Sequence, residues 1–297
     1  MDVGFIGIGQ MGKHMARHLL EAGYGLTVHD LRKEAAAALI EKGARWAGTP
    51  AEVAKSCRVV ISSLPAPQDI EQVVYGKNGL KAGWKKGDIY IDMSTNSPST
   101  IRRIAGDARA MGVAVLDAPV SGGTRGAELG SLAIMVGGDA ATLKKVRKVL
   151  ETMGQKIFPV GDVGCGNVAK LINNMIALTC SSICSEGFVL GTKAGIDPQV
   201  LWEIVTSSTG NNWVLQQFPQ TVFQGNFPPM YRLSLARKDI SLAVQMGKEY
   251  DVPLPVGAIV EQKLIDAESA GLGDKHIDAV ILRLEELIGL QVRSKQR

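Results

Sequence analysis

The segment Gly4-Phe5-Ile6-Gly7-Ile8-Gly9-Gln10-Met11-Gly12 places a G-x-G-x-x-G turn directly after a short apolar run. Gly7 permits a tight turn, Gly9 lets backbone approach a pyrophosphate, and Gly12 brings the following helix close to the strand. The N–H groups at the start of that helix favour an anion. A plain glycine-rich turn shows the same pattern, so its meaning depends on the surrounding sequence.

An acidic residue supplies that context. Asp30 ends the next apolar run, 18 residues after Gly12. A carboxylate there accepts hydrogen bonds from the ribose hydroxyls of a dinucleotide and repels a 2′-phosphate. The spacing therefore predicts a nicotinamide dinucleotide site and favours NAD over NADP, although the nearby Arg32 keeps NADP open.

The first half of the chain alternates short β-branched runs with amphipathic helical patterns, which predicts βαβ units and a mainly parallel α/β sheet in a domain covering residues 1–162. The expected strands are Val3–Ile8, Leu26–His29, Val59–Leu64, Ile89–Asp92, Val113–Leu116, Leu132–Val136 and Lys156–Val160.

The strand pattern stops after Gly164 and Gly166, and residues 163–297 are expected to form an all-helical domain. One long helix is predicted from Asn167 to about Lys193. Asp197-Pro198 is typical of a helix start, with an N-cap followed by Pro at the first helical position. Further helices are expected at Leu233–Glu249, Pro255–Ala270 and Ile277–Gly289.

Composition excludes several classes of protein. Of the net charge of +4, the last residues Arg293, Lys295 and Arg297 supply three, so the body is near neutral and nucleic acid is not expected as a partner. The four cysteines contain no C-x-x-C pair, which indicates a reducing, cytoplasmic setting. The most apolar stretch, Leu171–Cys184, is too short for a bilayer crossing of ~20 residues, so no membrane is expected.

Two strand ends carry polar side chains. Ser62-Ser63-Leu64-Pro65 and Asp92-Met93-Ser94-Thr95-Asn96 each lie at the carboxyl end of an expected strand, and ligands of open α/β sheets bind outside such carboxyl ends. Thr95 and Asn96 offer a hydroxyl and an amide to a nicotinamide carboxamide or to a substrate. A strand exit followed by a helix start explains the second segment equally well.

The segment Asp117-Ala118-Pro119-Val120-Ser121-Gly122-Gly123 predicts a turn that exposes a hydroxyl and successive backbone N–H groups. Such a turn is suited to a carboxylate. A plain Gly-Gly turn after a strand is the competing interpretation.

Lys170 and Asn174 lie four residues apart near the start of the long helix and share one face. Their neighbours are apolar, and dehydration lowers the pKa of a lysine toward the range that general acid/base catalysis needs. A lysine that extends its charged end to solvent from this helix is the competing interpretation, and the two rank equally. Lys238 and Asp239 form a charge cluster that a solvated helix face would explain.

Two other pairs carry no predicted chemistry. His14 and His18 have helical spacing for a metal, but no third ligand accompanies them, so no metal is predicted and both are assigned to a surface helix face. Cys180 and Cys184 are read as small core residues.

Taken in this order, the segments resemble the β-hydroxyacid dehydrogenase family over nearly the whole chain. Gly7 to Gly12, Asp92 to Thr95, Asp117 to Gly123, Gly166 to Asn174, and Lys238-Asp239 match the motifs of that family in sequence order. Each motif is unspecific by itself, whereas the combination is specific. The family includes 3-hydroxyisobutyrate dehydrogenases.

The resemblance implies a Rossmann domain followed by an all-helical domain built around a long interdomain helix, in a homodimer or homotetramer. It implies NAD as cofactor, since Leu31 stands where NADP-preferring members tend to carry Arg. It also implies a small carboxylate-bearing substrate, with Lys170 as catalytic acid/base. Cofactor contacts are implied for Gly7, Gly9, Gln10, Met11, Gly12, Asp30, Leu64, Pro65, Thr95 and Lys238, and substrate contacts for Ser121, Gly122, Gly123 and Asn174.

Departures from the family pattern concern the part of the substrate beyond its carboxylate. Asn96 stands where members commonly show an apolar residue, and Gly273-Asp274-Lys275-His276-Ile277 leads to Asp278 where many carry Ser. Asn96, together with Asn211 in the segment Ser208–Trp213, is therefore a candidate substrate contact.

The predicted activity is reversible hydride transfer between NAD and a small β-hydroxy acid resembling 3-hydroxyisobutyrate. The alternative enzyme is a reductase of a small carboxylated or sulfonated aldehyde, similar to tartronate semialdehyde, succinic semialdehyde or sulfolactaldehyde. Imine reductases usually lack the lysine, and 6-phosphogluconate dehydrogenases have a longer helical domain. A non-catalytic dinucleotide-binding scaffold is the alternative from another class; relatives of that kind lose the lysine, which is present here.

Overall fold

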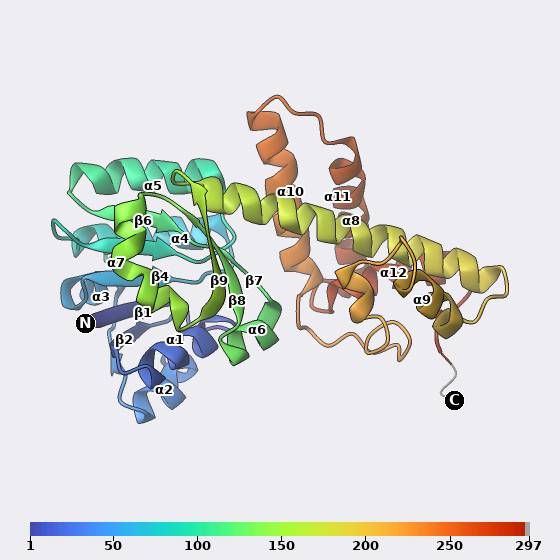
Figure 1. Cartoon of the computed structure of the whole chain (residues 1–297), viewed down its shortest axis with the longest axis horizontal. Helices are drawn as coiled ribbons and strands as arrows, with labels where there is room; N and C mark the ends of the chain where they lie inside the picture. The colour runs from blue at the N-terminus through green and yellow to red at the C-terminus, as the bar shows by residue number, and fades with distance from the viewer. Residues whose placement is uncertain (295–297) are drawn as a thin grey trace. The chain divides into compact units, whose positions relative to one another are not determined.

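The computed structural model describes residues 1–294 and shows an α/β part followed by a helical part (Figure 1). The chain divides into two compact units, the first covering Met1–Lys170 and the second starting at Leu171. Each unit is described by itself. The expected fold class, a mainly parallel Rossmann domain followed by helices, is confirmed.

The first unit is built on one sheet. Its strands, within residues 1–170, are β1 (Asp2–Ile6), β2 (Gly25–His29), β3 (Arg45–Trp46), β4 (Val59–Ser62), β5 (Ile89–Asp92), β6 (Ala114–Asp117), β7 (Val120–Ser121), β8 (Leu132–Gly137) and β9 (Gly154–Gly161).

The order of the strands creates the position for a ligand. From β3 through β2, β1, β4 and β5 to β6 every neighbouring pair is parallel. Beyond β6 the sheet continues through β8, which is antiparallel to β6 and β7 and parallel to β9. The chain winds one way from β1 to β3 and the other way from β4 to β6. Ligands of such sheets bind at the carboxyl ends beside this reversal, between β1 and β4.

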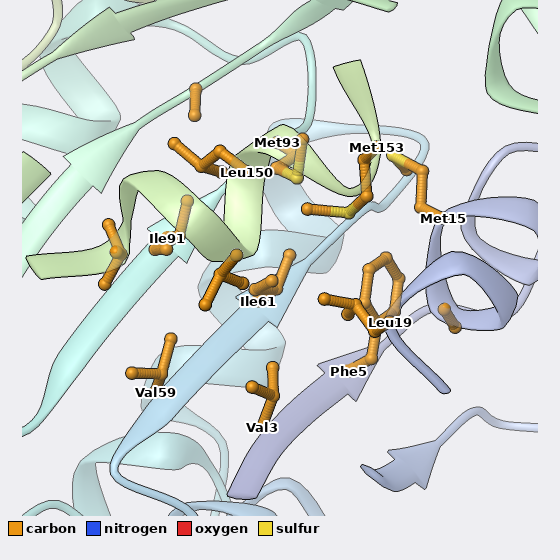
Figure 2. Close-up of a cluster of buried hydrophobic side chains, with 14 of the residues drawn as sticks. Val3, Phe5, Met15, Leu19, Val59, Ile61, Ile91, Met93, Leu150 and Met153 are labelled. Atoms are coloured by element: carbon orange, nitrogen blue, oxygen red, sulfur yellow. The ribbon is translucent and has the colours of Figure 1, made fainter. Parts of the chain in front are cut away.

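Helices cover both faces of the sheet because its strands are apolar on both sides. One core contains Val3, Phe5 and Ile61 with residues of α1 (Gly12–Glu21), α2 (Ala37–Glu41), α6 (Gly123–Leu129) and α7 (Ala140–Glu151). Figure 2 shows Phe5 beside Met15 and Leu19 of α1. The opposite core contains residues of α3 (Pro50–Ser56), α4 (Pro67–Tyr75) and α5 (Pro98–Ala110). The short 3₁₀ turns are η1 (Lys33–Ala36) and η2 (Leu80–Ala82).

The second unit is helical. It contains most of the long helix α8 (Cys165–Lys193), which begins in the first unit, followed by α9 (Pro198–Thr206), η3 (Trp213–Gln216), α10 (Leu233–Glu249), α11 (Pro255–Ala267), the π-helical turn η4 (Glu268–Leu272), the 3₁₀ turn η5 (Ile277–Val280) and α12 (Ile281–Ile288). Two apolar clusters hold these helices together, one of them centred on the rings of Phe188, Phe218 and Phe223.

The ends of several of these helices can be compared with the ends predicted from the sequence. Asp197 caps α9 by accepting from the N–H groups of Gln199 and Val200, as expected. The helix expected to run to Ala270 instead ends at Ala267 and continues as η4, where Gly271 has a positive φ of 81°. The last expected helix begins as the 3₁₀ turn η5.

Arg293, one of the three basic residues near the end of the chain, forms an ion pair. Its guanidinium donates to both carboxylate oxygens of the buried Glu285, at 2.6 and 2.9 Å. The residue is therefore part of the folded second unit. Lys295 and Arg297 lie outside the described residues.

Within residues 1–294, α8 has the length and composition of a membrane-crossing helix, although 33% of its most apolar window is buried inside the chain. The apolar stretch Leu171–Cys184 is only part of this helix, which spans 29 residues. The core helix of a soluble protein passes the same test of length and composition.

Candidate active site

The three glycines of the first turn have different surroundings. Gly7 has a φ of +93°, which favours glycine, and a Cβ there would meet the carbonyl oxygen of Ser63. A Cβ on Gly12 would overlap the carbonyl oxygen of Gly7. By contrast, a Cβ on Gly9 would have no atom within 4 Å. Gly7 and Gly12 are thus required by the fold, and Gly9 borders open space.

The start of α1 fits a bound anion. No side chain caps this helix, and Gly9 and Gln10 in front of it are exposed, with Met11 half-buried. The first N–H groups of a helix need an external partner. A dinucleotide pyrophosphate, lying against the open side of Gly9, would supply it.

Asp30 follows β2 and its carboxylate is tied to the same turn. One oxygen accepts from the N–H of Ile8 at 2.8 Å, and the other from the N–H of Arg32 at 2.9 Å. Each carboxylate oxygen retains a lone pair for a ribose hydroxyl. Leu31 is 98% exposed, so an apolar side chain and not a cation stands directly after the acid.

The ends of β4 and β5 are joined by hydrogen bonds. The N–H of Leu64 donates to Ser94 Oγ at 2.9 Å, which fixes the segment that carries Leu64 and Pro65. Leu64 and Thr95 are half-buried and Pro65 is exposed. These residues lie at the carboxyl edge of the sheet, as predicted from the sequence.

Asn96 differs from the expected substrate contact. It is fully buried; its side-chain amide donates to Asp92 Oδ2 at 3.1 Å and accepts from the N–H of Ser97 at 2.7 Å. Both ends of the amide are thus used inside the protein. The interpretation of this segment as a strand exit and helix start describes Asn96 better than a role in substrate binding.

The Ser121–Gly123 turn is open. Gly122 and Gly123 have positive φ values of 133° and 63° and are exposed, and Ser121 is half-buried at the end of β7. Residues with a side chain rarely adopt such φ values. The turn therefore presents backbone N–H groups beside a hydroxyl, as the carboxylate-binding interpretation requires.

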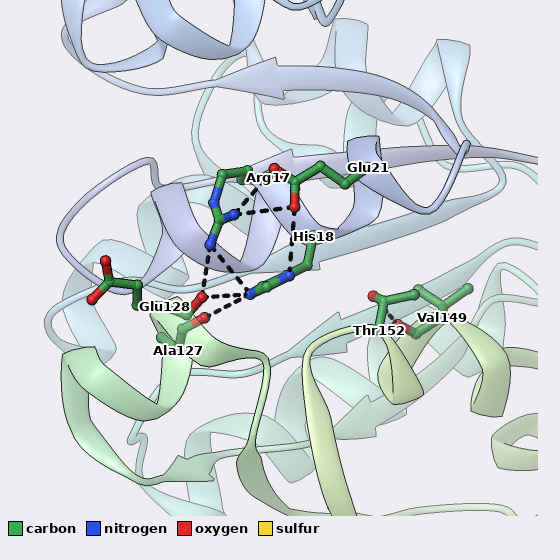
Figure 3. A network of polar contacts seen from close by, with 7 residues as sticks. All are labelled: Arg17, His18, Glu21, Ala127, Glu128, Val149 and Thr152. Carbon is green, nitrogen blue, oxygen red and sulfur yellow. Dashed lines mark hydrogen bonds and ion pairs between the residues drawn. The ribbon is translucent and has the colours of Figure 1, made fainter.

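The helix after this turn, α6, is held at its far end by α1 (Figure 3). Arg17 donates to the carbonyl oxygen of Glu128 at 2.7 Å, and His18 Nε2 lies 3.0 Å from the carbonyl oxygens of Ala127 and Glu128. Carbonyl oxygens only accept, so these two contacts are hydrogen bonds when His18 Nε2 is the protonated ring nitrogen. The assignment of His18 to a surface face was therefore incomplete, since its side chain links α1 to α6.

Metal ligation finds no support in the arrangement of side chains. Among residues 1–294, no three His, Cys, Asp or Glu residues are grouped as a metal site would require.

Lys170 lies in the second turn of α8 and is 9% exposed. The start of this helix is anchored to the carboxyl ends of β5 and β6, since Asn167 bonds both the N–H of Asn96 and the carboxylate of Asp117. These bonds hold the start of the lysine's helix at the same edge of the sheet as Thr95. Burial raises the pKa of Asp92, and it raises the pKa of Asp117 to about 6.

In the second unit, three side chains hydrogen-bond the side chain of Asn174. Its carbonyl oxygen accepts from Asn173 Nδ2 at 3.1 Å. Its Nδ2 donates to Asp239 Oδ2 at 2.7 Å and to the hydroxyl of Tyr231 at 3.4 Å. Tyr231 donates to the same carboxylate oxygen at 2.6 Å, and Lys238 Nζ lies 2.8 Å from Asp239 Oδ1. Burial, together with the charge of Asp239, raises the pKa of Tyr231 well above its usual range. A solvated helix face does not describe Lys238 and Asp239, because both belong to a hydrogen-bonded cluster with Asn174 and Tyr231.

The remaining candidates of the second unit lie elsewhere. Asn211 is exposed in the loop before η3. Asp278 is fully buried and accepts from Thr221 Oγ1 at 2.8 Å, with His276 Nδ1 at 3.2 Å, which is a structural arrangement inside the helical core.

Comparison with known proteins identifies the family. A family model described as "NAD binding domain of 6-phosphogluconate dehydrogenase" matches residues 2–161, and one described as "NAD-binding of NADP-dependent 3-hydroxyisobutyrate dehydrogenase" matches residues 164–284. The chain belongs to the β-hydroxyacid dehydrogenase family.

Relatives that match over nearly the whole of this chain support the same family. The chain is 36% identical to a 2-(hydroxymethyl)glutarate dehydrogenase of Eubacterium barkeri, over 100% of this chain and 99% of that one. It is 38% identical to a 3-hydroxyisobutyrate dehydrogenase of Pseudomonas aeruginosa, over 91% and 95% of the two chains. The solved structure of Mycobacterium tuberculosis 3-hydroxyisobutyrate dehydrogenase with L-serine has a TM-score of 0.88 and 31% identity, covering 95% of this chain and 98% of that one.

As a β-hydroxyacid dehydrogenase, the protein is an enzyme that carries out NAD(P)-dependent oxidation and reduction of small hydroxy acids. The contacts of Asn167 and Tyr231 were not predicted from the sequence, and neither was a role for Asp92 or Asp117. One signal was available, because both aspartates are acidic residues at the last position of an otherwise apolar strand.

Proposed function

We propose that this enzyme oxidises a 3-hydroxy acid of the form HO–CH₂–CH(R)–COO⁻, reversibly and with NAD, and that Lys170 is its catalytic acid/base. The observation that carries the proposal is the position of Lys170. Its side chain is buried on a helix whose first turn is anchored to the strand ends that hold Thr95 and the Ser121–Gly123 segment. A buried amine in such a place is suited to exchanging a proton with a bound alcohol.

The substrate class is inferred from what three relatives have in common. 3-Hydroxyisobutyrate, 2-(hydroxymethyl)glutarate and L-serine, named for those proteins, share a primary alcohol on the carbon β to a carboxylate. They differ only in R, which is a methyl, a carboxyethyl or an ammonium group. We therefore expect the hydroxymethyl and carboxylate groups to be required and R to decide specificity.

In the oxidation direction, neutral Lys170 would accept the hydroxyl proton at Nζ as the carbinol C–H bond breaks. In the reduction direction, the protonated amine would stabilise the developing alkoxide and return the proton. The nicotinamide, when bound, supplies the hydride acceptor or donor. Burial of Lys170 keeps the exchanged proton away from bulk water.

The carboxylate of the substrate would lie against the Ser121 hydroxyl and the N–H groups of Gly122 and Gly123. Asn174 offers the remaining lone pair of its carbonyl oxygen, which accepts from Asn173 Nδ2 at 3.1 Å, because its N–H groups are directed at Asp239 and Tyr231. An amide carbonyl accepts hydrogen bonds and cannot bind a carboxylate in this way. We therefore assign Asn174 to the substrate hydroxyl, and keep Asn211 as a candidate contact for R.

The cofactor would be held by the first glycine turn, by Leu64, Pro65 and Thr95 at the strand ends, and by Asp30 at the adenosine ribose. Lys238, kept beside Asp239 at 2.8 Å, is proposed as a further cofactor contact. We propose NAD as the preferred cofactor, because a carboxylate followed by the exposed Leu31 gives a 2′-phosphate a repulsive charge and no cation directly after it.

Replacing Asp30 with Ala should lower kcat/KM for NAD by about 10- to 100-fold, since hydrogen bonds to a charged group contribute ~1.5–3 kcal/mol. The NAD:NADP ratio of kcat/KM should fall accordingly. Asp2→Ala is a matched control, because Asp2 is an exposed carboxylate of the same unit that pairs with Arg45 at 2.8 Å. Steady-state kinetics with both cofactors measures the effect. A wild-type enzyme that prefers NADP would overturn the proposal.

A substrate panel tests the reaction itself. NADH formation is measured with 3-hydroxyisobutyrate, 2-(hydroxymethyl)glutarate, L-serine and 3-hydroxypropionate, and NADH consumption with semialdehydes and a sulfonated aldehyde. Turnover confined to HO–CH₂–CH(R)–COO⁻ acids and their aldehydes supports the proposal. Preference for the sulfonated aldehyde would establish the reductase alternative, and absence of turnover on the whole panel would contradict the proposed substrate class.

We also propose a homodimer or homotetramer. Ile172, Ile176, Ile183 and Leu190 are 42–70% exposed on α8, and their spacings of four, seven and seven residues form one stripe. Monomers seldom expose a long apolar stripe of this kind, so a second copy of the chain is the proposed partner. Light scattering on the purified protein measures the oligomeric state.

The domain boundary and the cellular location stay proposals as well. A boundary between residues 162 and 163 is supported by the two family models, which end and begin on either side of it. A cytoplasmic location is supported by the four cysteines, which are free thiols.

A further inference from the structure

The helix that carries Lys170 is capped by a carboxylate from the sheet. Asp117, the last residue of β6, is fully buried. Its Oδ1 accepts from the N–H of Gly164 at 2.7 Å, and its Oδ2 accepts from the N–H and the side-chain amide of Asn167 at 2.7 and 3.2 Å. Three donors at the start of α8 thus converge on one side chain nearly 50 residues away in the sequence.

The same turn of α8 is also bound to the neighbouring strand. Asn167 Oδ1 accepts from the N–H of Asn96 at 2.7 Å, and the amide of Asn96 donates to Asp92 at the end of β5. Asp92 in turn accepts from Ser62 Oγ at 3.0 Å, at the end of β4. The three strand ends that border the cofactor site are therefore connected to the first turn of α8.

Glycines let this turn approach the strand ends closely. A Cβ on Gly166 would lie 2.6 Å from the carbonyl oxygens of Asp117 and Met135, and one on Gly137 would meet Asp117 Oδ1. The contact has no room for another side chain. Small shifts of the helix relative to the sheet are therefore resisted.

A carboxylate in this position has an energetic cost. Burial, with a contribution from the charge of Asp92, raises the pKa of Asp117 to about 6 even though three N–H groups lower it. The exposed caps of the surface helices α7 and α9, Asp139 and Asp197, do not require burial of a charge. Capping alone does not explain why α8 is held by a buried aspartate.

We propose that Asp117 is a positioning residue for the reaction, which holds the first turn of α8 through Gly164 and Asn167 and thereby sets the location of the Lys170 amine at the carboxyl edge of the sheet. Lys170 follows Asn167 by three residues, less than one helical turn. Displacement of a catalytic group by about 1 Å can lower the rate about 10²-fold. This inference rests on the proposed role of Lys170.

The primary test replaces Asp117 with Asn, which retains the shape but turns a donor toward at least one N–H group. We expect kcat to fall 10- to 100-fold, with the Kd for NADH and the KM of the substrate changed less than threefold. Asp139→Asn is the matched control, because Asp139 is an exposed helix cap that accepts from the N–H and the hydroxyl of Thr142 and has no proposed contact with substrate, cofactor or the first turn of α8. Its kcat should stay within twofold of wild type.

A double-mutant cycle separates positioning from general loss of structure. If Asp117 acts through Lys170, the Asp117→Asn effect on kcat should shrink below threefold in a Lys170→Ala background. Activity of Lys170→Ala restored by added ethylamine should be equally insensitive to Asp117→Asn, because the free amine is not attached to the helix. A loss of 10-fold or more in both backgrounds, or an unchanged kcat in the single variant, would overturn the proposal.

A second variant covers the case in which Asp117→Asn does not fold. Asn167→Ala removes the side-chain bonds to Asp117 and Asn96 but keeps the backbone N–H bond to Asp117, and it should lower kcat three- to tenfold in the wild-type background only. If Lys170→Ala alone turns over normally, the proposed function fails, and that result is read independently of Asp117.

Discussion

Lys170→Ala is expected to lower kcat by about 10²–10⁴-fold, the range in which general acid/base groups contribute. The side chain is 9% exposed, so bulk water is a poor replacement for the missing amine. The residues assigned to the pyrophosphate and the ribose lie on other elements of the first unit, and NADH affinity should change less than threefold. Steady-state kcat on the best substrate of the panel and a fluorescence titration with NADH measure the two quantities.

A second partly buried lysine provides the control for this variant. Lys263 on α11 pairs with Glu186, and burial lowers its pKa. Lys263→Ala should keep kcat within twofold of wild type, because no proposed contact with substrate or cofactor involves this side chain. Near-normal turnover of Lys170→Ala would remove Lys170 from the acid/base role, and an equal loss in both lysine variants would indicate general destabilisation.

Much of the fold could be predicted because its signals are local. The strand Ile89–Asp92 and the helix Leu233–Glu249 have the predicted bounds, since each is delimited by apolar periodicity within its own segment. Elements that depend on distant partners were missed. β3 and β7 have two residues each and exist because β2 and β8 pair with them, which no periodicity within two residues can indicate.

The site shows the same division. Gly7, Gly12 and Asp30 could be recognised because their roles follow from spacing within one βαβ unit. The partners of Lys170 and Asn174 could not, because they are tertiary contacts. Asp117 reaches α8 across 47 residues and Asp239 reaches Asn174 across 65, and sequence alone gives no measure of either approach.

Asn96 illustrates why a polar residue in a motif is ambiguous. It stands among residues expected to face a ligand, yet its side chain satisfies Asp92 inside the sheet edge. A buried carboxylate needs hydrogen-bond donors, and an amide four residues beyond the strand end is within reach to supply one. Asp92 needs these donors because it is buried, and its burial depends on the tertiary structure.

The second large effect is expected from the glycines of the first turn, as a contrast between Gly12→Ala and Gly9→Ala. A Cβ on Gly12 would overlap the carbonyl oxygen of Gly7 and lie 3.1 Å from the Phe5 ring. Neither atom can move without displacing α1 or β1. Gly12→Ala should therefore lower the free energy of unfolding by about 3 kcal/mol, as overpacking of a rigid site does, and abolish measurable NADH binding.

Gly9→Ala should separate the two properties, since a Cβ there meets no atom within 4 Å of the protein itself. Its thermal midpoint should stay within about 2 °C of wild type, whereas the Kd for NADH should rise at least tenfold, because the methyl group would fill the space through which backbone approaches the pyrophosphate. Differential scanning fluorimetry and NADH titration give both values on the same samples. Unchanged NADH affinity in Gly9→Ala would place the pyrophosphate away from this turn, and equal destabilisation of both variants would mean that the two glycines serve the fold alone.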